Sequence, residues 1–151
     1  MEKGCFICEK HQDDSNIVGA KIFENDLFYI GHIHIEGNEH YLGHIMIDLK
    51  RHAPTLADLT IDEAKEYGRL SVLVSRALKE SEGAEHIYAL VSGNSVPHFH
   101  LHLIARYPNT PDEFWGPMEV RKAPNARKGS EGEVEKLCQR IKSYMEINAY
   151  E

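Results

Sequence analysis

The run HFHLHLI at residues 98–104 alternates histidine with apolar residues. Side chains at positions i, i+2 and i+4 of a β-strand point to the same face. The alternation therefore predicts a strand over about Pro97 to Ala105, with His98, His100 and His102 in one row. The other face of this strand is apolar and can pack beneath a helix.

Local patterns predict four more strands and two helices. The best-defined element is a helix over about Ile61 to Glu82, because Thr60 and Glu63 form a capping box and Gly83 suits the C′ position. The other expected elements are strands at Ala20–Phe23, Leu27–Ile33, Gly43–Leu49 and His86–Val91, a Pro-rich covering loop at Tyr107–Lys128 and an amphipathic helix at Glu131–Ile147. This order predicts an α+β fold, in which an antiparallel sheet of about five strands carries a long helix and a C-terminal helix.

The length and charge of the chain fit one domain. The chain has 151 residues and a formal net charge of −7, so we expect a single domain over residues 1–151. Its core is expected at about 5–106, with a covering loop and the C-terminal helix at 107–151. No run of lysine or arginine indicates nucleic-acid binding. The N-terminal segment lacks the apolar core of a signal peptide and no stretch approaches membrane-spanning length, so a soluble, cytoplasmic protein is expected.

The chain holds 10 histidines, and the row at 98–102 has three interpretations. It is a polar strand face that happens to be rich in histidine, a metal site, or a row in which one imidazole does chemistry and its neighbours orient it. The first is disfavoured, because three imidazoles beside apolar residues are costly to desolvate without a task. In one continuous strand the three rings would span about 13 Å, so at most two of them would bind one ion together.

Three segments, in consistent order, are similar to one known family. The run at 98–104 matches His-φ-His-φ-His-φ-φ, with φ hydrophobic, at every position. This is the signature of the histidine triad (HIT) family of nucleotide hydrolases and transferases. The segment GNSV at 93–96 looks like the family's Gly-Gln-Ser-Val, and GHIMIDLKRH at 43–52 resembles Gly-His-φ-φ-φ-Pro-Lys-x-His, with Leu49 where a proline is usual. The likeness spans about Cys5 to Ile104.

The resemblance implies a hydrolase that acts on the α-phosphate of a nucleotide. His100 would attack the α-phosphorus to form a nucleotidyl-histidine, which water then cleaves to a nucleoside monophosphate. Imidazole is largely neutral near pH 7 because its ordinary pKa is about 6.5, and a backbone carbonyl is expected to hold the proton on the other ring nitrogen. His102 would donate to the phosphate or the leaving group, and Asn94 and Ser95 would hydrogen-bond the same phosphate. His98 completes the expected catalytic set.

The family's nucleoside pocket is built partly from the first hairpin. Phe23, Phe28 and Ile30 are the apolar residues expected to line the base. Many members bind the ribose hydroxyls with an aspartate in this region, whereas His32 is a weak substitute for it here. The alternative, which we favour, is that the histidines of this region are exposed polar residues: His32, His34 and His40.

Cys5 and Cys8 form a Cys-x-x-Cys pair, which is a modest signal because structural zinc sites usually need four ligands. Many bacterial and archaeal HIT proteins carry such a pair completed by two histidines, and by position these would be His52 and His98. A Cys₂His₂ set suits a structural zinc ion that would tie the N-terminal arm to the sheet. The alternative is two small thiols in an arm, with Cys138 a core residue of the last helix.

Two other functions stay open at this point: a metalloenzyme that uses part of the histidine row, and a non-catalytic nucleotide sensor. The expected ligand is a purine nucleotide, and the triad does not distinguish a nucleoside phosphoramidate from a dinucleoside polyphosphate. Three roles stay open for Trp115: it stacks on a base, it caps the site, or it packs against the C-terminal segment. Family members commonly dimerise through the long helix and the adjoining strand, so a C2 homodimer is expected.

Overall fold

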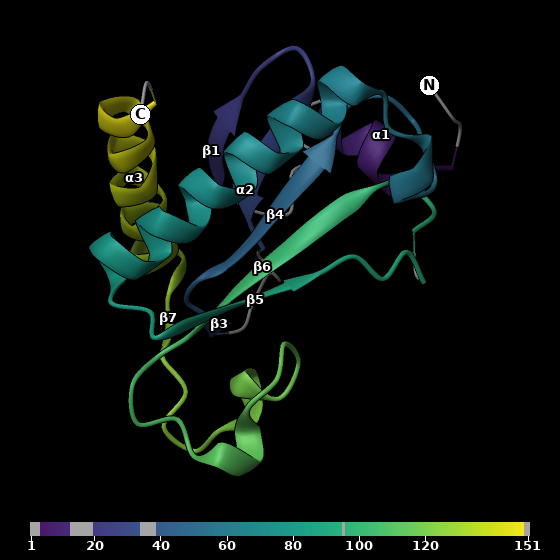
Figure 1. The fold of residues 1–151 in the computed structure, drawn as a ribbon. Coiled ribbons are helices and arrows are strands. Elements are labelled where there is room, and N and C mark those ends of the chain that lie inside the picture. The colour runs from purple at the N-terminus through teal and green to yellow at the C-terminus, as the bar shows by residue number, and fades with distance from the viewer. Residues whose placement is uncertain (1–3, 13–19, 34–38, 95, 150–151) are drawn as a thin grey trace.

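Five strands pair into one antiparallel sheet in the order β1-β2-β4-β6-β5 (Figure 1). The computed structural model describes residues 4–12, 20–33, 39–94 and 96–149. The strands of this sheet are β1 (Lys21–Glu24), β2 (Phe28–His32), β4 (His44–Leu49), β5 (His86–Leu90) and β6 (His100–Arg106). The predicted α+β class, with an antiparallel sheet of five strands, is confirmed.

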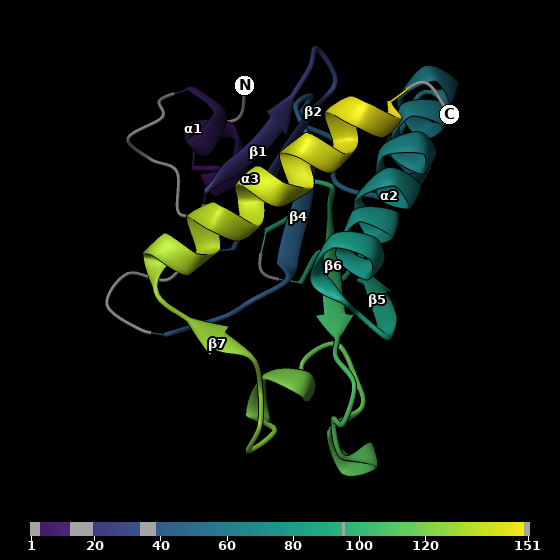
Figure 2. The ribbon, with the colours of Figure 1, turned by 90° about the vertical axis from the view of Figure 1, so that its left-hand side faces the viewer.

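Two long helices, α2 (Ile61–Glu82) and α3 (Glu131–Asn148), lie over the same face of the sheet (Figure 2). The bounds of α2 are those that the sequence predicts. The Thr60 side chain accepts a hydrogen bond from the Glu63 N–H, and Gly83 ends the helix in the left-handed region at φ 78°. No helix in the described part of the chain is long and apolar enough to cross a membrane.

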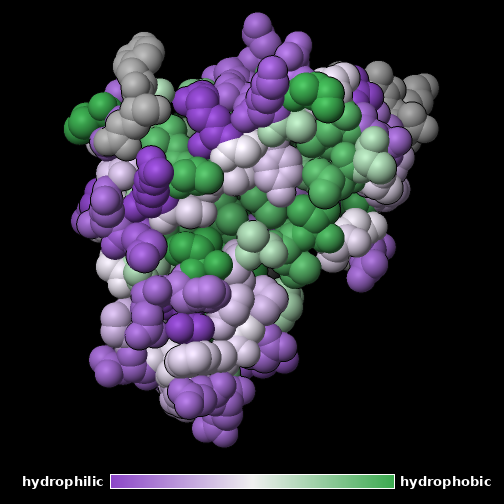
Figure 3. Space-filling model, in the orientation of Figure 1, coloured by the Kyte–Doolittle hydropathy of each residue, from purple (hydrophilic) through white to green (hydrophobic). Residues whose placement is uncertain are grey.

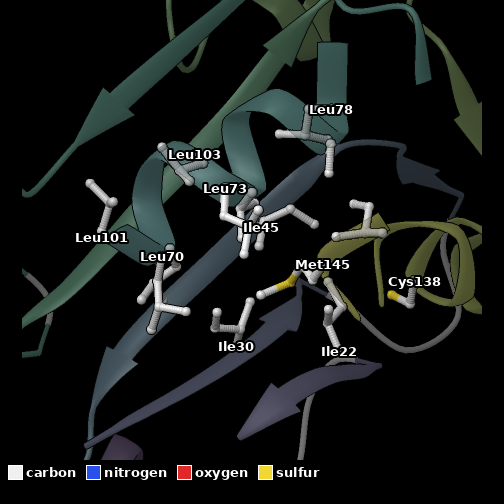
Figure 4. Packing of buried hydrophobic residues seen from close by; sticks show 14 of the residues in the cluster. Ile22, Ile30, Ile45, Leu70, Leu73, Leu78, Leu101, Leu103, Cys138 and Met145 are labelled. Carbon is white, nitrogen blue, oxygen red and sulfur yellow. The ribbon is translucent and has the colours of Figure 1, made fainter. Parts of the chain in front are cut away.

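The hydrophobic core lies between the sheet and these helices (Figure 4). Ile45 and Ile47 of β4 belong to one core cluster with Leu70 and Leu78 of α2, and all four side chains are almost fully buried. Each such burial contributes about 1.5–3 kcal/mol to folding. Met145 of α3 belongs to the same cluster, so the C-terminal helix shares the hydrophobic core with α2 and the sheet.

The opposite face of the sheet carries the histidines. The β4–β6 register pairs Asp48 with His100 and Met46 with His102, so these four side chains share the face that α2 and α3 do not cover. A short helix, α1 (Phe6–Gln12), lies at one end of this face. At the other end lies the segment between β6 and β7. It returns to the rest of the fold where β7 (Lys128–Gly129) pairs with β3 (His40–Tyr41).

The structure differs from the sequence prediction around His98. Strand β6 begins at His100 rather than at Pro97, because the backbone before it turns away to other partners. The His98 N–H donates to the Val96 carbonyl at 2.8 Å, and the Phe99 N–H donates to the Ala53 carbonyl at 2.7 Å. The three histidines are therefore not one row on a continuous strand, and only His100 and His102 share the β6 face. The short elements α1, β3 and β7 were not predicted.

Candidate functional site

His100 is the first residue of β6, and its side chain is held by the backbone just before it. Its Nδ1 lies 2.7 Å from the His98 carbonyl oxygen, which accepts the Nδ1 proton. In the neutral ring this leaves the lone pair on Nε2, the nitrogen that can act as a nucleophile. A backbone carbonyl is the acceptor expected for this proton, and the His98 carbonyl is in position to accept it.

His102 lies beside His100, with ring centroids 4.9 Å apart, and it contacts His44 of β4. The His102 Nδ1 and His44 Nε2 atoms are 2.9 Å apart. His44 Nδ1 is buried and has no hydrogen-bond partner among the described residues. A proton on that atom would leave a buried donor unpaired, so His44 carries its proton on Nε2 and donates it to His102.

This arrangement fixes the tautomer of His102. Because its Nδ1 accepts from His44, the neutral ring carries its own proton on Nε2, where it can be donated to an anion. Burial, followed by the charge of His100, lowers the pKa of His102 to about 4. Burial, followed by the charge of His102, lowers the pKa of His44 to about 2. Both rings are therefore neutral at pH 7, and His44 is a positioning residue that the sequence prediction did not identify.

His32 holds the start of β4. Its Nδ1 donates to the Ile33 carbonyl at 2.6 Å, and its Nε2 accepts from the N–H groups of Gly43 and His44 at 3.0 and 3.3 Å. His32 and His40 are both buried, so the expectation that they are exposed is wrong. His34 lies outside the described residues. The partners of His32 Nε2 lie 11 and 12 residues further along the chain, which sequence reasoning could not anticipate.

Cys5, Cys8, His52 and His98 converge at the end of the sheet near α1. Their ligand atoms lie within 4.8 Å of one another. The His98 Nδ1 lies 3.4 Å from each sulfur and 3.2 Å from the His52 Nδ1. Ideal tetrahedral zinc geometry gives about 3.5 Å between sulfur and nitrogen ligands and about 3.3 Å between two nitrogens. The four residues named from the sequence therefore form a group that could hold a metal ion, and they fit it in ligand type and spacing.

His98 links this group to His100. Its Nδ1 faces the two sulfurs, its Nε2 donates to the Leu49 carbonyl, and its own carbonyl accepts the His100 Nδ1 proton. The side chain is fully buried among these partners and does not stand in a row with His100 and His102. His98 thus contacts His100 through its backbone carbonyl and not through its imidazole.

Helix α1 is also anchored by a buried ion pair. The Lys10 ammonium contacts the Asp48 carboxylate, and the His11 Nε2 donates to the same oxygen at 3.2 Å. Burial alone would raise the pKa of Asp48, but the hydrogen bond from His11 and the charge of Lys10 outweigh it and lower that pKa. The sequence signal that could have found this contact is the alternation that puts Asp48 on the same strand face as His44, and the register then places Asp48 opposite His100.

The residues expected to line the base lie on the other face of the sheet. Phe28 and Ile30 pair with Leu49 and Ile47 and are fully buried in the core under the helices. Phe23 packs against the same core, because an irregularity in β1 between Lys21 and Phe23 turns it toward that face. Phe28 and Ile30 are therefore too buried to line a base pocket, which corrects that expectation. Phe23 is half-buried and lies on the face away from the histidines.

The loop before β6, which the sequence predicts to bind phosphate, is described only in part. Asn94 is exposed in the loop that precedes β6, and Ser95 lies outside the described residues. Gly93, just before them, has a φ of 67°, a value in the left-handed region that glycine adopts at no steric cost. This turn leads the chain back toward His98 and the start of β6.

The buried, neutral His44 gives a test by pH. Its pKa is about 2 in the folded protein and about 6.5 in an unfolded chain. Between these values the unfolded state binds more protons, so the free energy of unfolding falls as the pH falls below 6.5, by up to about 1.4 kcal/mol per pH unit for this residue. We expect His44→Gln to reduce that slope in urea unfolding between pH 7 and pH 5.

The matched control is His86→Gln, which removes an exposed histidine of β5. It should leave the slope of the unfolding free energy against pH at the wild-type value. Comparing each variant with wild type cancels the titration of the Cys/His group, which all three proteins share. Equal slopes in wild type and His44→Gln would contradict the buried, neutral state of His44.

A family model described as the HIT domain matches residues 15–109. Among curated proteins, a bis(5'-adenosyl)-triphosphatase of Saccharomyces cerevisiae is 35% identical over 66 residues, which cover 40% of this chain and 32% of the yeast protein. The chain thus matches about a third of the length of this relative.

Solved structures share the fold. A histidine triad nucleotide-binding protein from Sulfolobus tokodaii superposes with a TM-score of 0.68 at 23% identity, over 95% of this chain and 93% of that one. A Zn-bound histidine triad family protein from Mycobacterium smegmatis superposes with a TM-score of 0.66 at 15% identity, over 98% of both chains.

Proposed function

Because the chain belongs to the HIT family, we propose that it is a nucleotide hydrolase whose His100 attacks the α-phosphate and forms a nucleotidyl-histidine intermediate. The observation that carries the proposal is the hydrogen bond of 2.7 Å between the His100 Nδ1 and the His98 carbonyl. It directs the lone pair of the neutral ring to Nε2, as nucleophilic attack requires.

The proposed reaction has two displacements at phosphorus. In the first, the His100 Nε2 lone pair forms a bond to the α-phosphorus, and the bond to the leaving group breaks with its electron pair on the departing oxygen or nitrogen. A phosphate chain departs as the anion, whereas a departing amine nitrogen takes up a proton from solvent, which the proton lost from water in the second step replaces. The His102 Nε2–H donates to a phosphate oxygen or to the leaving atom. In the second, a water oxygen bonds to phosphorus, the N–P bond breaks, and its electron pair returns to Nε2. The products are a nucleoside monophosphate and a proton lost from the water.

We place the substrate among purine nucleotides, as a nucleoside phosphoramidate or a dinucleoside polyphosphate. The name of the yeast relative favours the second class. Asn94 and Ser95, in the loop before β6, are proposed to hydrogen-bond the phosphate. The protein's net charge of −7 makes neutral donors and a few local cations the means of binding this anion.

We further propose that Cys5, Cys8, His52 and His98 bind a zinc ion. The ligand types and their separations support this, and a zinc ion bound there would act as a structural cross-link. The residues themselves join α1 to the loop before β6. His100 and His102 stand outside this group, so the proposed chemistry is routed through the imidazoles alone.

A C2 homodimer through α2 and β5 is also proposed, with residues 1–151 as a single domain in each copy. Strand β5 stands at an edge of the sheet. Val72 on α2 and Val91 just after β5 are exposed apolar residues, and Figure 3 shows apolar surface gathered over the part of this view in which α2 and β5 lie. Exposed apolar area of this kind is a feature of protein interfaces.

The test of the proposed function is a substrate panel resolved by leaving group. Purified protein is incubated with diadenosine triphosphate, with an adenosine 5'-phosphoramidate, and with ATP, and nucleoside monophosphate release is followed by chromatography. We expect release from at least one of the first two. Tight binding without turnover would indicate a nucleotide sensor instead. If the Cys/His group is already fully loaded with metal and turnover still requires added metal, the protein would be a metal-dependent hydrolase.

A further inference from the structure

The segment between β6 and β7 packs back onto the histidine face of the sheet. It contains two short turns of 3-10 helix, η3 (Asp112–Phe114) and η4 (Val120–Lys122). Val120 is 1% exposed and forms a buried cluster with Ile104 and Tyr41. Ile104 pairs directly with His44 and follows His102 by two residues, so it lies on the same face about 6.6 Å further along β6. Because Val120 packs on Ile104, η4 lies at the end of the histidine face next to His44 and His102.

This segment is fixed at several points. The Arg106 guanidinium stacks on the Trp115 ring at 3.7 Å, a cation–π contact that accounts for the position of this tryptophan. At the far end, the Leu42 N–H donates to the Arg127 carbonyl at 2.9 Å, and the Tyr107 hydroxyl donates to the Leu42 carbonyl at 2.8 Å. The position of η4 is thus set by packing and hydrogen bonds at both ends.

Arg121 follows Val120 and is half-buried. Within the part of the chain that the structure describes, its side-chain partner is the sulfur of Met118 at 3.7 Å, and it forms no ion pair with a carboxylate. Burial and the neighbouring histidines lower the pKa values of His44 and His102, and the charge of Arg121 adds to both effects. Among the described residues the Arg121 guanidinium thus has no carboxylate partner, and its charge acts on both histidines from the end of the face away from α1.

We propose that Arg121 binds the phosphate groups of the leaving group and so selects nucleotides whose leaving group is a phosphate chain. A substrate with its α-phosphorus at His100 would extend past His102 toward Arg121. Guanidinium forms paired, charge-assisted hydrogen bonds with phosphate oxygens, whereas the amine released from a phosphoramidate offers it no charge. This inference rests on the proposed function and narrows it to polyphosphate substrates.

The test compares Arg121→Gln with Lys122→Gln, which removes one positive charge from the exposed neighbouring residue of the same turn. For each protein kcat/KM is measured with diadenosine triphosphate and with an adenosine 5'-phosphoramidate whose leaving amine is uncharged. Arg121→Gln should lower kcat/KM by about 10- to 100-fold for the triphosphate and by less than about threefold for the phosphoramidate. Lys122→Gln should change neither by more than about threefold.

The ratio of the two kcat/KM values decides the question, because damage to the fold would lower both together. Arg121→Lys should recover part of the lost ratio, since lysine keeps the charge without the paired geometry. An unchanged ratio in Arg121→Gln, or an equal loss in Lys122→Gln, would overturn the proposal.

Binding separates this inference from the proposed function. The affinities of AMP and ADP are measured by calorimetry in the same three proteins. We expect ADP to bind wild type more tightly than AMP, and Arg121→Gln to lose that difference. A wild type that binds in this way but hydrolyses nothing would refute the hydrolase while leaving the role of Arg121 intact. If the triphosphate is hydrolysed equally well by wild type and Arg121→Gln, the hydrolase is supported and the role of Arg121 is refuted.

Discussion

Replacing His100 with asparagine is expected to lower nucleoside monophosphate release by about 10³-fold or more. The asparagine amide can still donate to the His98 carbonyl, which holds the imidazole of wild type at 2.7 Å, but it offers no lone pair for attack on phosphorus. Loss of the group that forms a covalent intermediate removes the whole two-step route. The measurement is kcat on the best substrate of the panel, together with mass spectrometry of the protein quenched during turnover.

Two further readouts make this prediction specific. The quenched wild type should carry a nucleotidyl adduct on the peptide that contains residue 100, and His100→Asn should carry none. The variant should still bind AMP and keep the wild-type melting temperature within about 4 °C, since even complete loss of the hydrogen bond to the His98 carbonyl would cost about 1 kcal/mol. His86→Gln is the control, because it removes an exposed histidine of β5. Activity of His100→Asn within tenfold of wild type would refute the nucleophile.

Replacing Cys8 with serine is expected to abolish binding of the proposed zinc ion and to lower stability strongly. The Cys8 sulfur lies 3.4 Å from the Nδ1 atoms of both His52 and His98, so its loss leaves three ligands. An ion present at about 1,000 times its dissociation constant stabilises the fold by about 4 kcal/mol. For a chain of this length that corresponds to a fall in Tm of about 8–16 °C. Metal content by mass spectrometry and Tm by circular dichroism measure the two effects.

Cys138→Ser is the matched control for this change. Cys138 is as buried as Cys8, but it packs in the main core and its sulfur contacts the Ala20 carbonyl. Its replacement should retain one metal ion per chain and give the baseline cost of a buried cysteine-to-serine change. Wild-type metal content in Cys8→Ser, or an equal fall in Tm in both variants, would contradict a structural zinc ion in the Cys/His group.

The features predicted correctly from the sequence depend on neighbouring residues. Helix α2 begins and ends where the capping box of Thr60 and Glu63 and the glycine at 83 put its ends, because caps act within one turn. Strand β4 was found by its alternation, which also separates Ile45 and Ile47 from His44. The four metal-ligating candidates came from the family resemblance, and the structure brings them together.

The features predicted wrongly depend on contacts between distant segments. The strand at His98 was broken by the hydrogen bond from Phe99 to Ala53, which the local alternation does not contain. Phe28 and Ile30 suit a base pocket by residue type, but the register with β4 turns them into the core. His32 looks like an exposed polar residue, whereas its partners are the backbone atoms of Gly43 and His44.

The distances along the chain between the four Cys/His residues set an order of assembly. Cys5 and His98 are 93 residues apart, and Cys8 and His52 are 44 apart. During synthesis Cys5 and Cys8 emerge first. His52 follows after three of the five strands, and His98 follows after four. Closing so long a loop carries an entropic cost that the folded sheet must already offset. Because the His98 carbonyl also holds the His100 ring, the proposed nucleophile lies beside the point where the beginning of the chain meets its late partners.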